Sequence, residues 1–230
     1  MRRLPAISRA CAPTKMVADQ VRGCFVTIEG IEGVGKSTNL GVVAELLRDA
    51  GCDVVVTREP GGTPLAERIR GLLLDSERGS VPGMAELLLM FAARSSHLES
   101  LIKPALARGS WVLCDRFTDA SYAYQGGGRG LDTAWIAALE KQVQGELRPD
   151  LTLLLDADPE VTRSRREARG VTDRFEAEDA AFFQRVRENY LERAAAEPGR
   201  IRLVDAAQPL DEVRKTLSKV VAEFLKIVEK

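Results

Sequence analysis

The stretch FVTIEGIEGVGKSTNL (residues 25–40) decides the fold of this chain. A short apolar and β-branched run leads into a glycine-rich bend, and a Lys-Ser-Thr triplet then opens a helical pattern. The segment GIEGVGKS matches the phosphate-loop pattern G-x-x-x-x-G-K-[ST] at Gly30, Gly35, Lys36 and Ser37. Glycines let the backbone curl so that successive N–H groups point inward at an anion. The order strand, loop, helix therefore predicts a nucleoside triphosphate site.

The loop and the first helical turn supply the predicted ATP-binding residues. Lys36 should reach the outer phosphates, and the hydroxyl of Ser37 is placed to bind magnesium. The positive end of the helix that begins near Lys36 adds to the attraction for phosphate. The alternative interpretation is a flexible glycine turn without a ligand. The predicted ATP-binding residues are Gly30, Ile31, Glu32, Gly33, Val34, Gly35, Lys36, Ser37 and Thr38.

The composition indicates a single globular domain. The 230 residues are 45% hydrophobic and 29% charged, with a net charge of -1 and a pI of about 6.0. This balance excludes the basic field typical of nucleic-acid binding, and no apolar run is long enough to span a bilayer. Four cysteines without C-x-x-C spacing predict reduced thiols in a cytoplasmic protein. We expect residues 1–22 to form a disordered extension and residues 23–230 to form one domain.

Short apolar runs alternate with longer stretches of helical period. Their near-continuous Val, Leu and Ile content suits strands buried on both faces of a parallel sheet. The alternation predicts a three-layer α/β/α fold with a five-stranded parallel sheet and right-handed crossovers. The glycine-rich segments REPGGTP, QGGGRG and EARGVTDR are interpreted as loops. The expected strands are residues 24–29, 52–57, 111–115, 151–157 and 200–206, and the expected helices are residues 36–50, 64–74, 84–108, 133–147, 159–169, 177–196 and 210–229.

Charged residues end two of the expected strands. Arg58 and Glu59 follow one strand, and Asp115 and Arg116 end another. Because the carboxyl ends of parallel strands meet at one edge, these side chains should gather near the phosphates. Converging arginines favour a second anion, such as the phosphate of an acceptor, and Asp115 is placed to support magnesium. Purely structural arginine–carboxylate pairs are the alternative.

Four segments together resemble the bacterial thymidylate kinase (dTMP kinase) family of P-loop nucleoside monophosphate kinases. They are EGIEGVGKSTN, TREPGGTPLAERIR, CDRFTDASYAYQGGGRGLD and DRFE. The resemblance runs from about Phe25 to the last helix. It implies magnesium-dependent transfer of a phosphoryl group from ATP to dTMP, which gives ADP and dTDP for dTTP biosynthesis. It also implies a homodimer, with which the apolar residues 84–108 are consistent.

The resemblance implies residue roles at the two phosphates. Arg116 resembles the clamp on the dTMP phosphate, and Asp115 would hold magnesium or orient Arg116. Glu32 resembles the acidic residue that lies near the acceptor nucleotide. The predicted metal ligands are therefore Ser37 and Asp115, and Lys36, Arg116 and Glu32 are predicted to be catalytic.

The resemblance also implies how the acceptor would be recognised. Arg94 would bind the thymine edge or the phosphate, and Ser121 and Gln125 would read the base. The ring of Tyr124 would crowd the 2′ position of the sugar and favour deoxyribose, with Glu59 supporting the pocket. The predicted dTMP-binding residues are Glu59, Arg70, Phe91, Arg94, Arg116, Ser121, Tyr124 and Gln125.

The sequence departs from the family at the aromatic residue that stacks on thymine. The family usually has a phenylalanine four residues before the arginine that matches Arg94, where this chain has Met90. Phe91 stands three residues before Arg94. Because positions three and four apart are neighbours on a helix, we expect Phe91 to stack. The alternative is that Phe91 belongs to the core and Met90 lines the pocket.

Residues 162–176, TRSRREARGVTDRFE, are predicted to form a short mobile lid over ATP. The variable positions of the phosphate loop contain no basic residue, although phosphoryl transfer gains from a cation on the migrating group. The segment resembles the thymidylate kinase subclass that carries its catalytic arginine in the lid. Arg166 and Arg169 are the two candidates, and a solvated charged helix is the alternative.

Two other functions compete with this one. A kinase for another monophosphate, such as dUMP or dCMP, would share the fold, and only the resemblance at Tyr124 and Gln125 favours dTMP. A regulatory module that binds ATP without turnover would also carry the phosphate loop. The intact set of Lys36, Ser37 and Arg116 argues against that module.

Overall fold

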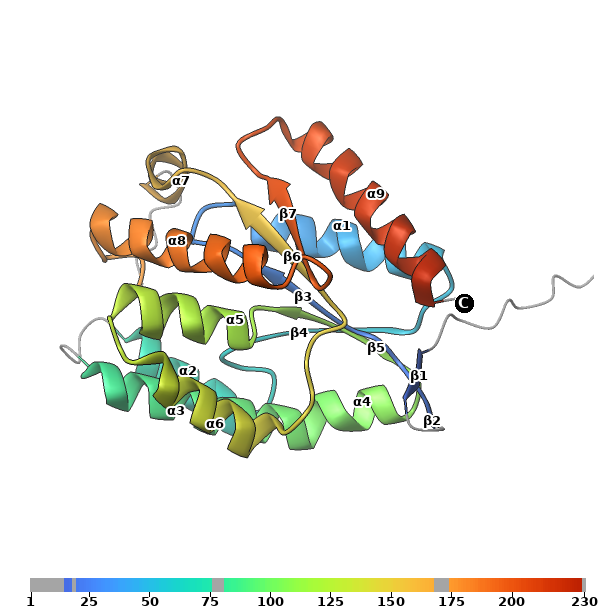
Figure 1. Cartoon of the computed structure of the whole chain (residues 1–230), viewed down its shortest axis with the longest axis horizontal. Helices are drawn as coiled ribbons and strands as arrows, with labels where there is room; N and C mark the ends of the chain where they lie inside the picture. The colour runs from blue at the N-terminus through green and yellow to red at the C-terminus, as the bar shows by residue number, and fades with distance from the viewer. Residues whose placement is uncertain (1–14, 18–19, 76–80, 168–173, 229–230) are drawn as a thin grey trace, which may run out of the picture.

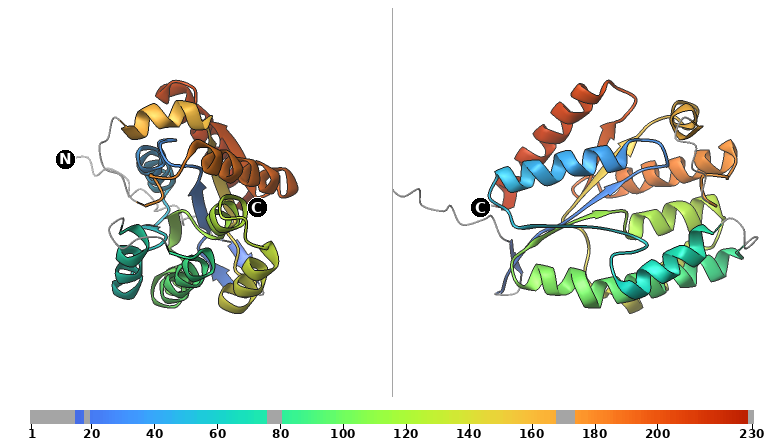
Figure 2. Two further views of the ribbon diagram at one scale, coloured as in Figure 1. Left: turned by 90° about the vertical axis from the view of Figure 1, so that its left-hand side faces the viewer. Right: turned by 180° about the vertical axis from the view of Figure 1, so that it is seen from behind.

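The computed structural model describes residues 15–17, 20–75, 81–167 and 174–228. At its centre lies a five-stranded parallel sheet in the order β4-β5-β3-β6-β7 (Figure 1). Helices cover both of its faces (Figure 2), so the predicted α/β/α class is confirmed. The strands are β3 (Phe25–Glu29), β4 (Val54–Arg58), β5 (Trp111–Asp115), β6 (Leu151–Asp156) and β7 (Ile201–Asp205).

Alternate residues of the central strands pack into two different cores. Val26 and Ile28 of β3 contribute to one core, and Phe25 of the same strand contributes to the other. All five residues of β3 are buried, which explains why its sequence is nearly continuously apolar. The helical segments are α1 (Lys36–Asp49), α2 (Pro64–Leu74), α3 (Gly83–His97), η2 (Leu98–Ile102), α4 (Lys103–Ala107), α5 (Thr118–Ser121), η3 (Tyr122–Gly128), α6 (Thr133–Gln144), α7 (Pro159–Glu167), α8 (Ala180–Ala196) and α9 (Leu210–Val228).

The parallel sheet sets the position of the functional residues. All five strands run the same way, so their carboxyl ends meet at one edge. The phosphate loop leaves the sheet there after β3, and Arg116 leaves it after β5. No described helix combines the length and the apolar content needed to cross a bilayer.

The long helix expected at residues 84–108 is interrupted. Helix α3 ends at His97, and the π-helical segment η2 precedes α4. Pro104 has no N–H to donate to the carbonyl one turn earlier, and its ring crowds that carbonyl. A local widening of the helix accommodates both effects.

The expected loop QGGGRG is mostly helical, so that prediction is wrong. Residues 125–128 belong to η3, which packs against α8. A Cβ atom at Gly127 would lie 2.8 Å from the carbonyl oxygen of Arg185, and one at Gly128 would lie 2.5 Å from the ring of Phe182. The glycines therefore allow η3 and α8 to pack closely against each other. The segment EARGVTDR lies largely outside the described residues.

The expectation of disorder across residues 1–22 is wrong for its last part. The short strands β1 (Lys15–Val17) and β2 (Gln20–Arg22) pair as an antiparallel ribbon. Arg22 donates to both carboxylate oxygens of Asp150, each at 2.9 Å. This two-pronged ion pair ties the ribbon to the segment before β6. Residues 1–14 and 18–19 lie outside the described part of the chain.

Candidate active site

The loop after β3 curls as its sequence pattern requires. Gly30, Gly33 and Gly35 have φ angles of 135°, 83° and 89°, which residues with a Cβ atom rarely adopt. A Cβ atom at Gly30 would lie 2.3 Å from the carbonyl oxygen of Leu155 on β6. The neighbouring strand therefore excludes any larger residue at this position.

Lys36 is held against the loop that precedes it. Its Nζ donates to the carbonyl oxygens of Gly30 at 3.0 Å and Ile31 at 2.9 Å. Burial, and then the charge of Arg116, lowers the pKa of Lys36 to about 8. The ammonium group is thus fixed beside the curled backbone, where an incoming phosphate would find it.

A cavity of about 460 Å³ opens beside the loop. Asp115 forms part of its wall, and the buried Oδ1 of Asp115 accepts no hydrogen bond from any described residue. Among the residues that the structure describes, no group of three or more His, Cys, Asp and Glu side chains could hold a metal ion. A single unused carboxylate near a hydroxyl fits magnesium, which retains waters and binds substrate phosphates. The cavity is lined by Glu32, Gly33, Gly35, Lys36, Ser37, Thr38, Arg70, Asp115, Arg116, Arg165 and Glu176.

Arg116 is fixed by four hydrogen bonds. Its Nη1 donates to the carbonyl oxygen of Gly30 at 2.8 Å and to the hydroxyl of Tyr190 at 3.1 Å. Its Nη2 donates to Glu32 Oε1 at 2.7 Å and to the hydroxyl of Tyr124 at 2.9 Å. The backbone of Arg116 has a φ of 69°, in the left-handed region that is uncommon outside glycine.

Glu29, the last residue of β3, holds this turn in place. Its Oε1 accepts from the backbone N–H of Phe117, and its Oε2 accepts from the hydroxyl of Tyr190, both at 2.7 Å. Burial, reinforced by the charge of Asp119, raises the pKa of Glu29 to about 7. Glu29 had no predicted role, because a glutamate at a strand end carries no signal of a partner 88 residues away in the chain.

Glu32 lies between the loop and a neighbouring pocket. Burial opposes its ionisation, but the charges of Arg116 and Lys36 hold the pKa of Glu32 below its ordinary value. The hydroxyl of Tyr124 donates to the same carboxylate. Glu32 is therefore a fixed negative charge beside the cationic groups of Arg116 and Lys36.

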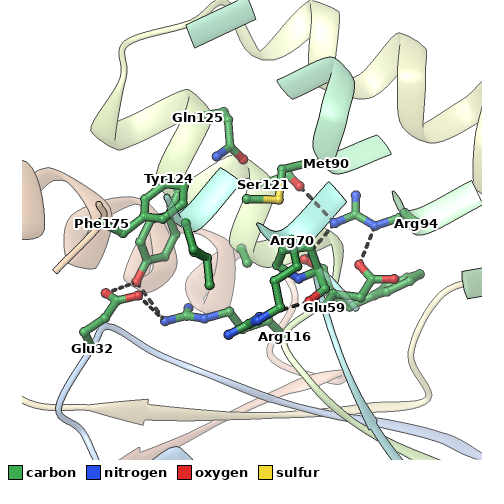
Figure 3. Close-up of a pocket in the computed structure, with 14 residues that line it drawn as sticks. Glu32, Glu59, Arg70, Met90, Arg94, Arg116, Ser121, Tyr124, Gln125 and Phe175 are labelled. Carbon is green, nitrogen blue, oxygen red and sulfur yellow. Dashed lines mark hydrogen bonds and ion pairs between the residues drawn. The ribbon is translucent and has the colours of Figure 1, made fainter. Parts of the chain in front are cut away.

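A second cavity, of about 90 Å³, adjoins the first. Glu32, Arg70 and Arg116 line both cavities. Figure 3 shows Glu32 and Arg116 at one end of the second cavity and Gln125 at the other. The structure brings together here seven of the eight residues predicted to bind dTMP, which are Glu59, Arg70, Arg94, Arg116, Ser121, Tyr124 and Gln125.

Arg94 is a buried wall residue of this second cavity. Its Nε donates to Glu59 Oε2 at 2.7 Å, and its Nη2 donates to the carbonyl oxygen of Phe117 at 3.2 Å and to the hydroxyl of Ser121 at 3.0 Å. The buried Nη1 has no partner among the described residues. Glu59 also contacts His97, 3.0 Å from Oε1 to Nδ1. One donor of Arg94 is therefore left for a ligand.

The structure places Met90, rather than Phe91, in the wall of this cavity. Phe91 is 2% exposed and packs in a core with Leu87 and Ile136. Successive residues of a helix diverge by about 100°, so α3 turns only one of the two towards the cavity. The expectation that Phe91 faces the acceptor pocket is wrong.

Arg58 does not join the cluster that the sequence analysis expected. Its side chain is half exposed and pairs with Glu67 of α2 at 2.8 Å. It lines neither of the two cavities. Successive side chains along a strand point to opposite faces of the sheet. Glu59, one position after Arg58, therefore lines the second cavity while Arg58 does not.

Three lining residues were missed at the lid. Arg165 lines the first cavity and donates from Nη1 to the carbonyl oxygen of Ala206 at 3.2 Å. Glu176 lines the same cavity, and Phe175 lines the second. The DRFE motif was the signal that could have pointed to Phe175 and Glu176. The predicted lid arginines are not tested, because the side chain of Arg166 and all of Arg169 lie outside the described residues.

Comparison with known proteins identifies the family. The family model described as thymidylate kinase matches residues 28–217. The chain belongs to the thymidylate kinase family. The match begins in β3 and extends into α9, so it contains both cavities.

Curated relatives and solved structures agree with this assignment. A thymidylate kinase of Pseudomonas syringae pv. tomato is 60% identical over 205 residues, which cover 89% of this chain and 98% of the relative. A thymidylate kinase of Pseudomonas fluorescens (strain Pf-5) is 60% identical over 203 residues, covering 88% and 97%. The crystal structure of thymidylate kinase from Ehrlichia chaffeensis matches with a TM-score of 0.70 and 32% identity, over 87% of this chain and 98% of that one.

Proposed function

We propose that this member of the thymidylate kinase family transfers the γ-phosphoryl group of ATP to dTMP, giving ADP and dTDP. The observation that carries the proposal is the shared wall of two cavities, in which Arg116 lies between a phosphate loop and a second pocket. A phosphate oxygen of dTMP would attack the γ-phosphorus, and the bond to the oxygen that bridges the β and γ phosphorus atoms would break. Positioning and charge neutralisation account for most of such catalysis.

The residues divide between the two nucleotides. The curled backbone from Gly30 to Thr38 and the ammonium of Lys36 would bind the phosphates of ATP. Arg116, held by Glu32 and Tyr124, would grip the phosphate of dTMP. Its fixed guanidinium loses little freedom on binding, which favours a preorganised site.

Magnesium is the proposed cofactor. The hydroxyl of Ser37 and the carboxylate of Asp115 would hold it, since both line the cavity beside the loop and the Oδ1 atom of Asp115 has no other described partner. When bound with ATP, it would offset the negative charge of the β and γ phosphates. The chain itself contributes the oxygen ligands and the cavity.

The catalytic cation of the lid is proposed to be Arg166 or Arg169. Arg166→Ala or Arg169→Ala should lower kcat by about 10³-fold or more with little change in the KM for dTMP, because the cation would act on the migrating phosphoryl group. Steady-state kinetics of the two variants measures this. Arg148→Ala is the control, because Arg148 donates to backbone carbonyls and lines neither of the two cavities, and its kcat should match the wild type. A normal kcat in both lid variants would exclude both lid arginines.

A homodimer and a cytoplasmic location are also proposed. Leu65 and Leu72 lie seven residues apart on α2 and so share a face, and they are 54% and 42% exposed. Leu88 of α3, the helix that packs on α2, is 52% exposed. Such a set of exposed leucines supports burial against a second copy of the chain.

The deciding experiment is an ADP-release assay with ATP and each of dTMP, dUMP, dCMP, AMP and GMP. We expect dTMP to have the highest kcat/KM. The Lys36→Ala variant should be inactive with all of them, since the outer phosphates lose their ammonium partner. Highest activity with another monophosphate would reassign the acceptor, and ADP release without any acceptor dependence would favour an ATPase or a regulatory module.

A further inference from the structure

Glu86 of α3 is a completely buried carboxylate that does not line either cavity. Its Oε1 accepts from Nε2 of Gln125 at 2.8 Å. Its Oε2 accepts from Nη2 of Arg174 at 2.6 Å, and Nε of Arg129 lies 3.3 and 3.4 Å from the two oxygens. Two segments distant from α3 in the chain, residues 125–129 and Arg174, therefore meet on one side chain.

The charge of this cluster decides which way the amide of Gln125 faces. Two guanidinium groups neighbour Glu86, so its carboxylate offers only acceptors. An amide that contacts such a carboxylate must turn its NH₂ group towards it, because an amide oxygen would face a negative charge with no proton between them. Glu86 thereby leaves Oε1 as the group of Gln125 available to a ligand.

The available polar atoms of the second cavity then form a defined pattern. Gln125 lines the cavity and presents an acceptor, while Arg94 lines it and has Nη1 as a donor without a described partner. Thymine and uracil carry an N–H at position 3 and a carbonyl oxygen at position 4, which complement an acceptor and a donor. Cytosine has the opposite pattern, an acceptor at position 3 and an amino donor at position 4.

We propose that Glu86 is a specificity-determining positioning residue, which fixes the amide of Gln125 so that the acceptor cavity selects a thymine or uracil edge over a cytosine edge. The inference rests on the proposed function, because it assumes a pyrimidine monophosphate acceptor. Glu86 touches no substrate and acts only through Gln125. An amide at position 86 could both donate and accept, so Gln125 would be free to turn over.

The test compares dUMP with dCMP in the Glu86→Gln variant. These two acceptors share the lack of a 5-methyl group, so the ratio of their kcat/KM values isolates the polar edge of the base. In the wild-type enzyme we expect a strong preference for dUMP. In Glu86→Gln the ratio should fall by at least about tenfold, because a site built to hydrogen-bond one pattern discriminates only while its groups stay oriented.

Glu178→Gln is the matched control. Glu178 accepts from Nη1 of Arg129 at 2.6 Å but does not contact Gln125, so its ratio should stay within twofold of wild type. If Glu86→Gln does not fold, Glu86→Asp keeps the charge near Arg129 and Arg174 but withdraws the carboxylate from Gln125, and it should show the same fall.

The outcomes separate the two proposals. A folded Glu86 variant in which activity with dUMP and dCMP falls equally has an unchanged ratio, and this would overturn the specificity role while leaving the proposed function intact. A wild-type enzyme that phosphorylates none of dTMP, dUMP and dCMP would overturn both. The inference is supported if kcat/KM for dCMP rises relative to that for dUMP in the Glu86 variants and not in Glu178→Gln.

Discussion

At the scale of single residues, Arg116 links the two halves of the site. Its guanidinium contacts the phosphate loop through Gly30 and the second cavity through Glu32 and Tyr124. Four hydrogen bonds hold the guanidinium group in one place, so the side chain would lose little freedom on binding the proposed substrate phosphate. Preorganisation of this kind reduces the entropy cost of binding.

Replacement of Arg116 should change the KM for dTMP more than the KM for ATP. Arg116→Ala should raise the KM for dTMP by about 10–100-fold, the value of a lost hydrogen bond to a charged group, and raise the KM for ATP much less. Initial rates with each substrate varied in turn measure both constants. Arg58→Ala removes an arginine outside both cavities and should leave both unchanged. A larger effect on ATP would reverse the assignment of the cavities.

Glu29 should make the stability of the fold depend on pH. Its carboxyl has an ordinary pKa of 4.5 and a pKa of about 7 in the folded protein. Between these values the folded state binds a proton that the unfolded chain releases, so stability is greatest at low pH and falls as the pH rises through 7. The contribution is up to about 3 kcal/mol.

The Glu29→Gln variant isolates this contribution. Glutamine imitates the protonated carboxyl, so the variant should gain stability relative to wild type as the pH rises from 5 to 8. Urea unfolding at four pH values across that range measures the difference. Glu188→Gln, on the exposed side of α8, should show no such trend, and a constant difference between Glu29→Gln and wild type would contradict the assignment.

At the scale of elements, the packing of η3 on α8 depends on two glycines. Gly127→Ala would place a methyl group 2.8 Å from the carbonyl oxygen of Arg185. Overpacking against backbone should cost about 1–3 kcal/mol, and thermal denaturation should show a Tm lower by several degrees. Gly41→Ala in α1 meets no atom within 4 Å and should be neutral or stabilising. Equal Tm values for the two variants would show that α8 can move away.

Helices and strands with a clear hydrophobic period were predictable from the sequence. Strand β5 and helix α2 have the predicted bounds. The other four strands of the parallel sheet differ from their predicted bounds by at most two residues at either end. The run from Tyr122 to Gly128 was not predictable in this way, since its glycines indicate a loop locally and only the contact with α8 makes them helical. Tertiary packing overrides local propensity there.

The candidate site was predictable where a motif fixes a residue's position on the fold. The phosphate loop and the DR pair after β5 gave Lys36, Asp115 and Arg116. Spacing alone could not decide between Met90 and Phe91, because the direction of each side chain depends on how α3 is rotated against the sheet. Glu29 and Glu86 were missed because their partners lie far away in the chain and no motif contains them.

At the scale of the whole molecule, the exposed leucines of α2 and α3 bear on the proposed dimer. Light scattering after gel filtration should give about twice the 25.2 kDa mass of one chain. Leu88→Glu should shift this to the mass of one chain, because a charge buried in an apolar interface is costly. Ile227→Glu, on an exposed position of α9, should remain dimeric, and a dimeric Leu88→Glu would place the interface elsewhere.

Glu32, Arg70 and Arg116 line both cavities. Binding in one cavity should therefore affect binding in the other. A compound bound in the smaller cavity would contact side chains that also line the cavity proposed for the triphosphate. Its potency should therefore vary with the nucleotide concentration. Thermodynamic reciprocity requires the nucleotide's affinity to change by the same factor when the compound is bound. Inhibitor screens on this enzyme would therefore rank compounds differently with and without a nonhydrolysable ATP analogue.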